Sequence, residues 1–173
     1  MKMKWIAPVA GVLLIVFRPF RVGDFVEAGG VSGAVEEVQI FTTVLRTPDN
    51  KKVILGNSAI TDSAITNYAA YDTRRIDLVF GVAYDDDLRL ARDVIGRVLE
   101  QEGRVLQDPA PTVGVVELAD SSVNFVVRPW VQTSDYWSVY FDLTEAMKKA
   151  FDEAGLSIPF PQRDVHLHPV EAA

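Results

Sequence analysis

Two groups of side chains in the sequence could in principle bind a metal ion. Asp85, Asp86 and Asp87 are consecutive carboxylates. His166 and His168 stand two positions apart, which would place them on one face of a strand. Consecutive carboxylates point in different directions, however, and two imidazoles are fewer than a zinc site needs. Because the aspartates precede a helical pattern, they are better explained as helix caps. We therefore expect a helix start here, with no resident metal and no cofactor.

No arrangement typical of an active site occurs elsewhere in the sequence. The chain has no cysteine, which excludes thiolate nucleophiles, thiolate zinc sites and disulfides. Neither histidine lies in the context of a nucleophile elbow. The glycines of residues 29–33 fall between two strand patterns and lack the G-x-G-x-x-G spacing, which predicts a turn and not a phosphate cradle. The sequence predicts no catalytic residue and no enzyme.

The charge balance of the 173-residue chain argues against a polyanionic partner. Lys+Arg 17 and Asp+Glu 24 give a formal net charge of -7, and the basic residues do not cluster. One aromatic group could stack bases, but its surroundings are acidic or neutral, so packing in a core or an interface is favoured. We therefore expect no nucleic acid partner. The aromatic group consists of Trp130, Tyr136, Trp137, Tyr140 and Phe141.

The amino-terminal part of the chain is apolar from Trp5 to Phe17. A run of this length is shorter than the about 20 residues that a helix needs to cross a bilayer. Arg18 and Arg21 follow it, as expected at the cytoplasmic end of a membrane helix, and Pro19 would end that helix. Three interpretations stay open: the last turns of a membrane helix, a signal peptide, and a buried terminal helix of a soluble protein.

Residues 22–70 alternate between short β-prone runs and turn residues. Gly29-Gly30 and Pro48-Asp49-Asn50 favour tight turns, so neighbouring runs should pair as antiparallel hairpins. About 45 residues supply little core, so such a small, bent barrel needs neighbours that cover its edges. We predict a small β-barrel that oligomerises, with strands at residues 25–28, 31–41, 44–47, 53–55 and 64–68.

The following segment changes to an alternation of strand and helix patterns. The order β-α-β-β-α is that of a ferredoxin-like domain without its final strand, with both helices on one face of the sheet. A last short strand, at residues 164–168, has no partner in either domain, which suggests pairing with copies of itself. The expected elements are a strand at 76–82, a helix from the aspartates to just before Gly103, strands at 112–118 and 122–131, and a helix at 134–154 ended by Gly155.

Several motifs carry a resemblance to a known family. The stretch FRPFRVGDFV, residues 17–26, with the apolar residues from 10 onwards, resembles the junction between pore helix and cytoplasmic domain in the small-conductance mechanosensitive channel (MscS) family. The chain departs from the usual Ile-Pro-Asn of that family with Leu55-Gly56-Asn57, which puts the rigidity of this turn in doubt. The resemblance covers nearly all of residues 10–168 and continues through residues 30–36, 40–43, 46–49, 65–68, 81–85, 123–125 and 155–162.

The resemblance implies an α+β fold and a homoheptamer. Each subunit would contain a remnant of the pore-lining transmembrane helix (1–21), an Sm-like β domain (22–70), a ferredoxin-like α/β domain (71–160) and a terminal barrel strand with a tail (161–173). Seven copies would enclose a vestibule on the cytoplasmic side of a bacterial or archaeal inner membrane. In the family this vestibule lies below a pore that releases small solutes on hypoosmotic shock. Because at least three membrane helices precede this region in family members, we expect the chain alone not to conduct.

The resemblance also implies roles for residues near the membrane. Gly11 corresponds to a hinge-like position in the pore helix, and Arg18 and Arg21 correspond to the membrane exit, where the helix or its upstream part contacts lipid. As an alternative, Gly11 allows close helix packing.

The resemblance places two further pairs of residues along the path of permeating ions. Tyr71 and Asp72 lie where the family has openings between subunits, so Asp72 would attract cations unless Arg74 neutralises it. His166 and His168 would line the terminal barrel.

A second function remains as an alternative to the channel. Sm-like barrels and ferredoxin-like sheets both occur in soluble nucleic-acid-binding modules. The sequence pI of about 4.8 and the lack of an aromatic-plus-basic strand motif count against this alternative.

Overall fold

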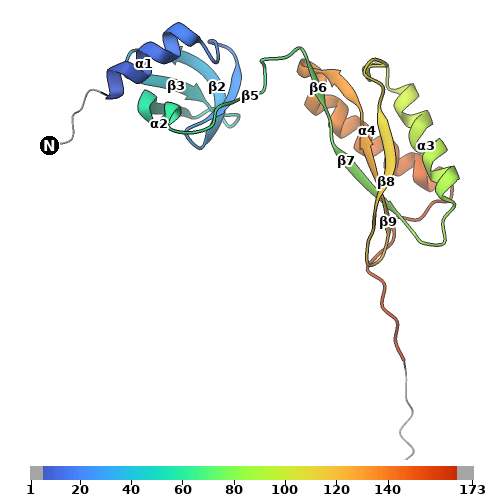
Figure 1. Cartoon of the computed structure of the whole chain (residues 1–173). Helices are drawn as coiled ribbons and strands as arrows, with labels where there is room; N and C mark the ends of the chain where they lie inside the picture. Colours follow the sequence, from blue (N-terminus) through green and yellow to red (C-terminus); the bar gives the residue numbers. More distant parts are fainter. Residues whose placement is uncertain (1–5, 167–173) are drawn as a thin grey trace, which may run out of the picture. The chain divides into compact units, whose positions relative to one another are not determined.

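The computed structural model describes residues 6–166 and divides the chain into two compact units, with the boundary between Asp72 and Thr73 (Figure 1). The β unit contains α1 (Ile6–Phe17), β1 (Phe25–Ala28), β2 (Val31–Val38), β3 (Thr42–Arg46), β4 (Lys52–Gly56), α2 (Asn57–Thr61) and β5 (Thr66–Asn67). The α/β unit contains β6 (Thr73–Arg75), β7 (Leu78–Val82), α3 (Leu88–Gln101), β8 (Thr112–Leu118), β9 (Val123–Arg128), β10 (Trp130–Gln132), a 3-10 turn (Thr133–Asp135) and α4 (Tyr136–Glu153).

The β unit is one antiparallel five-stranded sheet with the strand order β4-β3-β2-β1-β5. Its hairpins turn where the sequence predicts. Gly29 and Gly30 have φ of 57° and 78°, and Asn50 has φ of 64°, values that glycine and asparagine tolerate best. A bulge between Val35 and Glu37 bends β2. The sheet can therefore curve around a small core.

The sequence analysis missed the short helix α2 and extended β2 too far. Helix α2 connects β4 and β5, which are the two opposite edges of the sheet, so the chain must cross the end of the unit there. Its Ile60 is fully buried, and that burial compensates for residues of modest helix propensity. Strand β2 ends at Val38 because Ile40 and Phe41 form the turn on which α2 packs.

The core of the β unit includes residues from the amino-terminal segment. Leu14 of α1 and Phe20 just after it are each only 4% exposed, and they pack with Val26, Leu45 and Ile60. Helix α1 is therefore part of the folded β unit. The opposite side of α1 stays apolar and exposed, since Val12, Val16 and Phe17 are 52%, 67% and 75% accessible. None of the helices within residues 6–166 combines the length and apolar character required to cross a membrane.

The α/β unit has the element order that the sequence predicts. Its three-stranded sheet is antiparallel with the order β7-β9-β8, and β6 pairs separately with β10. The predicted strand at 122–131 is divided in two at Pro129, which has no backbone N–H to continue the ladder. The predicted strand at 112–118 has the observed bounds of β8.

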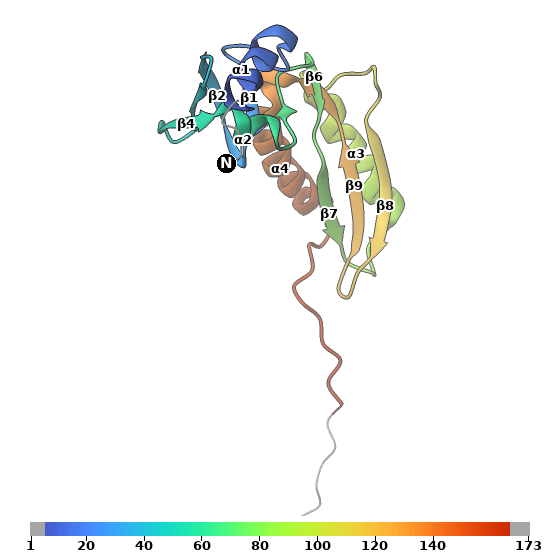
Figure 2. The ribbon, with the colours of Figure 1, turned by 60° about the vertical axis from the view of Figure 1, so that its left-hand side comes forward.

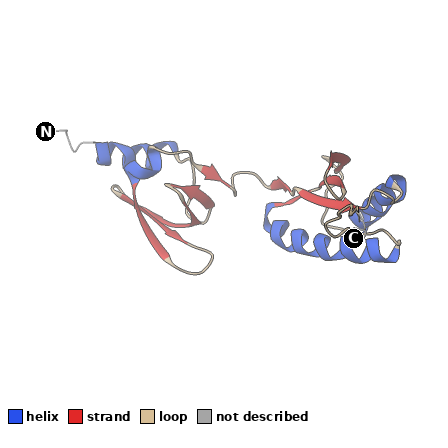
Figure 3. Ribbon diagram, turned by 90° about the horizontal axis from the view of Figure 1, so that it is seen from below, coloured by secondary structure: helices blue, strands red, loops and turns tan. Residues whose placement is uncertain are grey.

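Both helices cover the same face of this sheet (Figures 2 and 3). Burial alternates along the strands: Leu78 and Val82 are buried on β7, whereas Val79 between them is 60% exposed. The buried side chains of β7 and β9 pack with α3 and α4 in one cluster around Phe125 and Phe151. The other face of the sheet is open in the single chain.

The helix ends of the α/β unit follow the sequence pattern. Asp87 caps α3, because its carboxylate accepts a hydrogen bond of 2.8 Å from the Arg89 N–H. Gly155 has φ of 71° and follows α4 as predicted. Helix α3 ends at Gln101 with Glu102 as its C-cap, just before Gly103 as predicted, although Gly103 does not have a positive φ.

An ion-pair network joins the loop after α3 to α4. The Arg104 guanidinium contacts the carboxylates of Glu102 and Asp142 at 2.7 and 2.6 Å. The hydrogen bonds from Arg104 lower the pKa of Glu102 below its ordinary value. This network ties α3 and α4 together at the surface, above the core that they share.

The backbone at Gly56 generates a first prediction. Gly56 has φ of −67°, the value to which proline is restricted. The Asn57 N–H bonds across to the Phe41 carbonyl, and donors alternate along an antiparallel strand, so the Gly56 N–H points away from β3 on the edge strand β4. Gly56 thus has the φ value that proline would impose in the usual Ile-Pro-Asn sequence of the MscS family, but no ring restricts its backbone to that value.

We expect Gly56→Pro to stabilise the β unit by about 0.4–1 kcal/mol, because it restricts the unfolded chain and removes no strand hydrogen bond. Denaturant unfolding of the whole chain measures this. Gly30→Pro is the matched control and should destabilise, since Gly30 has φ of 78°. A loss of stability in Gly56→Pro would show that this N–H is needed.

Candidate functional site

The contact between helix α1 and the β unit is made at Gly11. A Cβ atom at this position would lie 1.7 Å from the carbonyl oxygen of Ile40 and 2.8 Å from the Asn57 side-chain nitrogen. No L side chain fits there unless the backbone moves. We call this contact area, the backbone of residues 39–41 together with Asn57, the α1 docking surface. The observed close packing explains a glycine at position 11, and a hinge at this position stays a prediction.

Asn57 holds the α1 docking surface in place. Its side-chain nitrogen donates to the carbonyls of Gln39 and Ile40 at 2.8 and 3.1 Å, and its side-chain oxygen accepts from the Thr43 hydroxyl at 2.8 Å. Its backbone N–H donates to Phe41 at 2.9 Å. Asn57 and Thr43 are fully buried, so these bonds replace those that water would provide. Sequence reasoning singled out Asn57 only as part of a turn.

Arg18 and Arg21 lie where α1 ends. Arg18 has φ of 46° and turns the chain out of the helix. The chain is then fixed by Asp24, whose carboxylate accepts from the Arg21 backbone N–H at 2.9 Å and from the Asn67 side chain at 2.8 Å. Neither arginine side chain forms an ion pair with any residue between 6 and 166. Both border a groove of about 430 Å³ that is otherwise apolar, with Leu14 in it.

Tyr71 and Asp72 lie in the exposed segment between the two units, and Tyr71 is 79% accessible. The Arg74 guanidinium lies 3.9 Å from the centre of the Tyr136 ring. Neutralisation of Asp72 by Arg74 stays an alternative. Whether Asp72 faces permeating ions stays a prediction.

A few positions further along the chain lies a cluster of charged side chains that the sequence analysis missed. Asp77 contacts Arg75 and Arg128 at 3.2 and 2.7 Å. Arg128 is distant in sequence, and only the pairing of β7 with β9 brings it next to Asp77. The signal available in the sequence was a charged residue, Asp77, within the predicted strand at 76–82.

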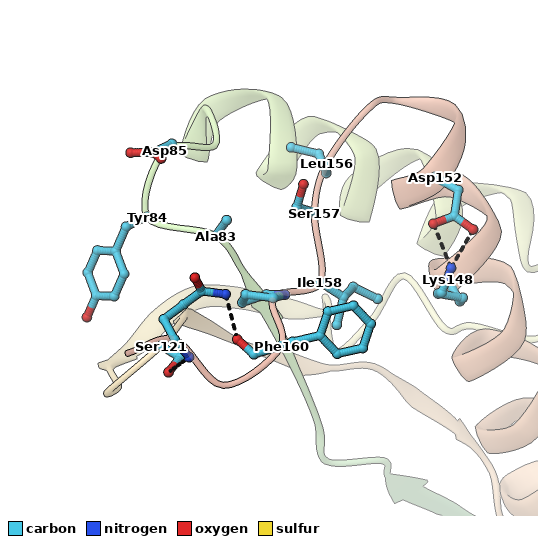
Figure 4. Close-up of a pocket in the computed structure, with 12 residues that line it drawn as sticks. Ala83, Tyr84, Asp85, Ser121, Lys148, Asp152, Leu156, Ser157, Ile158 and Phe160 are labelled. Atoms are coloured by element: carbon cyan, nitrogen blue, oxygen red, sulfur yellow. Dashed lines mark hydrogen bonds and ion pairs between the residues drawn. The ribbon is translucent and has the colours of Figure 1, made fainter. Parts of the chain in front are cut away.

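The carboxyl-terminal segment leaves α4 beside an open cleft of about 670 Å³ (Figure 4). Between residues 154 and 166 the chain forms no strand. His166 is exposed, and His168 lies outside the described residues, so the predicted terminal strand and its histidines stay a prediction.

The aspartates at the start of α3 have separate structural roles. Asp87 caps the helix, and Asp86 accepts hydrogen bonds from the backbone of Ala83 at 3.0 Å and of Ser157 at 2.9 Å. Among residues 6–166 no three metal-ligating side chains come together. The aspartates are thus used in capping and in holding the carboxyl-terminal segment.

The close packing at Gly11 generates a second prediction. In an unrestrained helix, Gly→Ala stabilises by about 1 kcal/mol. Here the new methyl group would collide with the Ile40 carbonyl, so we expect Gly11→Ala to destabilise the β unit by about 1–3 kcal/mol and to increase amide exchange in α1.

Denaturant unfolding and hydrogen exchange of the whole chain test this expectation. Val12→Ala serves as the control, because Val12 is exposed on the same helix. If Gly11→Ala instead raised stability, helix propensity alone would govern the site and α1 would not pack on Ile40.

Two family models together match most of the chain. Residues 8–70 match the model described as "Mechanosensitive ion channel, beta-domain", and residues 76–158 match "Mechanosensitive ion channel MscS, C-terminal". Both describe parts of an ion channel, and neither describes an enzyme.

Curated relatives carry the same family name. A small-conductance mechanosensitive channel of Edwardsiella ictaluri is 50% identical over 159 residues, which cover 92% of this chain and 56% of the relative. An MscS family protein of Archaeoglobus fulgidus is 41% identical over 157 residues, with 91% and 56% covered. The chain thus spans about half the length of these relatives.

Solved structures agree with the sequence comparisons. The crystal structure of Helicobacter pylori MscS in the closed state matches with a TM-score of 0.90 and 31% identity, over 95% of this chain and 66% of that one. Arabidopsis thaliana MSL1 matches with a TM-score of 0.74 at 21% identity, which shows a shared fold alone. From these matches, the chain belongs to the small-conductance mechanosensitive channel (MscS) family.

Proposed function

We propose that this chain forms the cytoplasmic vestibule of a channel that opens under membrane tension and releases small solutes on hypoosmotic shock. The observation that carries the proposal is the double use of α1. One face of the helix packs into the core of the β unit through Leu14 and Gly11, while the other stays apolar and exposed. A helix with these two faces can join a membrane segment to a rigid cytoplasmic body.

The strand orders support the domain assignment within this proposal. The order β5-β1-β2-β3-β4, with a strongly bent β2, supports an Sm-like domain at residues 22–70. The order β7-β9-β8 with two helices on one face supports a ferredoxin-like domain at residues 71–160. Residues 161–173 would supply the strand of a terminal barrel.

We further propose a ring of seven copies at the cytoplasmic side of a bacterial or archaeal inner membrane. The sheet of the β unit has two open edges, and its apolar Ile40, Phe41 and Ile54 are 53%, 59% and 61% exposed. Neighbouring copies would cover these edges and side chains. Arg18 and Arg21 would then contact lipid headgroups at the membrane exit.

The mechanism follows from the rigidity of the α1 docking surface. Tension that tilts the upstream part of the helix would act on Gly11, which packs on a turn held by the side chain of the buried Asn57. Because that turn resists deformation, helix movement would concentrate at Gly11 or above it. No observation favours the nucleic-acid-binding alternative.

Restoring upstream membrane helices tests the proposed function. We expect a chimera of the amino-terminal half of the Edwardsiella ictaluri relative with residues 10–173 of this chain to give tension-activated currents in patches. The purified chain should have seven times the subunit mass of 19.1 kDa in solution. A folded, membrane-inserted chimera without tension-activated current would contradict the proposal.

The exposed position of Asp72 generates a third prediction, in the same chimera. Seven copies of this carboxylate at openings of the vestibule should raise the local cation concentration within about 8–10 Å. We therefore expect Asp72→Asn to shift the reversal potential under a salt gradient towards anions. Asp93→Asn, an exposed change of equal charge on α3, is the control. Equal reversal potentials in both variants would place Asp72 away from the permeation path.

A further inference from the structure

The carboxyl-terminal segment of the α/β unit is held at two points. At its start, the Ser157 N–H donates to Asp86 at 2.9 Å, and the Ser157 carbonyl accepts from the Ala83 N–H at 3.0 Å. At its end, the Gln162 N–H donates to the hydroxyl of Ser121, at the tip of the β8–β9 hairpin, at 3.0 Å. The chain between these points therefore has a defined path.

Phe160 stands in the middle of this segment and is 84% exposed. Prolines at 159 and 161 flank it, and each fixes its own φ and restricts the residue before it. An aromatic side chain on so restricted a backbone loses little conformational entropy when it binds. Its exposure leaves a large apolar surface in water, which a partner could cover.

The cleft beside this segment is lined in part by the segment itself, through Ile158 and Phe160, and otherwise by residues 83–85, Ser121 and α4 (Figure 4). Its volume of about 670 Å³ exceeds what one aromatic ring fills, and Leu156, only 5% exposed, forms part of its apolar wall. Lys148 and Asp152 pair at one side, and Asp85 lies at the other. Asp85 forms no ion pair with residues 6–166, and neither does Arg163, three positions after Phe160. The exposed segment and the cleft are thus complementary in apolarity and in charge.

We propose that Phe160 of one copy docks into this cleft on the next copy of the chain. The inference rests on the proposed ring, because the strand proposed for the terminal barrel begins directly after Phe160. If those strands meet, the segments before them must also lie close to neighbouring copies. In a closed ring of seven copies every contact between neighbours is head-to-tail, so this contact would repeat around the ring.

A photo-crosslinking amino acid in place of Phe160 tests the contact directly. Benzoylphenylalanine would be placed at position 160 of the unlabelled full chain, which is refolded in mixture with ¹⁵N-labelled chain. We expect products between labelled and unlabelled chains, with the attachment mapped by mass spectrometry to residues 83–85 or 148–158. Products only within one chain, or at other surfaces, in a sample that has the mass of a ring would overturn the docking.

Substitution of Phe160 provides the second measurement. Phe160→Ser should raise the protein concentration at half-dissociation of the ring by about tenfold or more, without lowering the unfolding temperature of the dissociated chain. Leu90→Ser, at an exposed leucine of α3, is the control. Unchanged ring dissociation in Phe160→Ser contradicts this contact alone. A wild-type chain that stays monomeric contradicts the ring and the contact together.

Discussion

The folded β unit depends on the buried hydrogen bonds of Asn57. This side chain satisfies two carbonyls of the β2–β3 turn and the hydroxyl of Thr43, and both Asn57 and Thr43 are fully buried. Removing it would leave the buried Thr43 hydroxyl without this partner, at a cost of about 1–3 kcal/mol, and would release the two turn carbonyls. The turn that it holds is the surface on which Gly11 packs, so the position of α1 depends on the same bonds. A single amide thus links the end of the sheet, the short helix α2 and the amino-terminal helix.

Some apolar residues of α1 are buried in the β unit and others are exposed, and amino-acid composition does not distinguish the two groups. Leu14 is apolar because it lies in the core of the β unit, whereas Val16 and Phe17 are apolar and exposed in the single chain. Hydropathy alone left a membrane helix, a signal peptide and a buried helix as alternatives. The packing of Leu14 and Gly11 shows that the end of this helix belongs to the β unit, whatever its upstream part contacts.

The sequence predicted those elements that depend on local chemistry. The glycines at 29 and 30, Asn50 and the cap at Asp87 were found because each satisfies a backbone requirement within a few residues. Helix α2 was missed because it forms through burial of Ile60 against distant strands. Likewise, Asp77 and Arg128 lie 51 positions apart and meet only through strand pairing. The proposed number of seven copies came from the family resemblance, because local patterns indicated only that the chain oligomerises.

The two ends of the described chain are held by the same device. Asp24 accepts hydrogen bonds from Arg21 and from Asn67 where the chain leaves α1, and Asp86 accepts from Ala83 and Ser157 where the chain leaves α4. In each case one carboxylate joins a near neighbour to a residue more than 40 positions away, which fixes the direction of the chain at that point. Charged acceptors make the stronger class of hydrogen bond, so these junctions resist bending better than a free linker would. A force applied through α1 or through the carboxyl-terminal segment would therefore act on a whole unit.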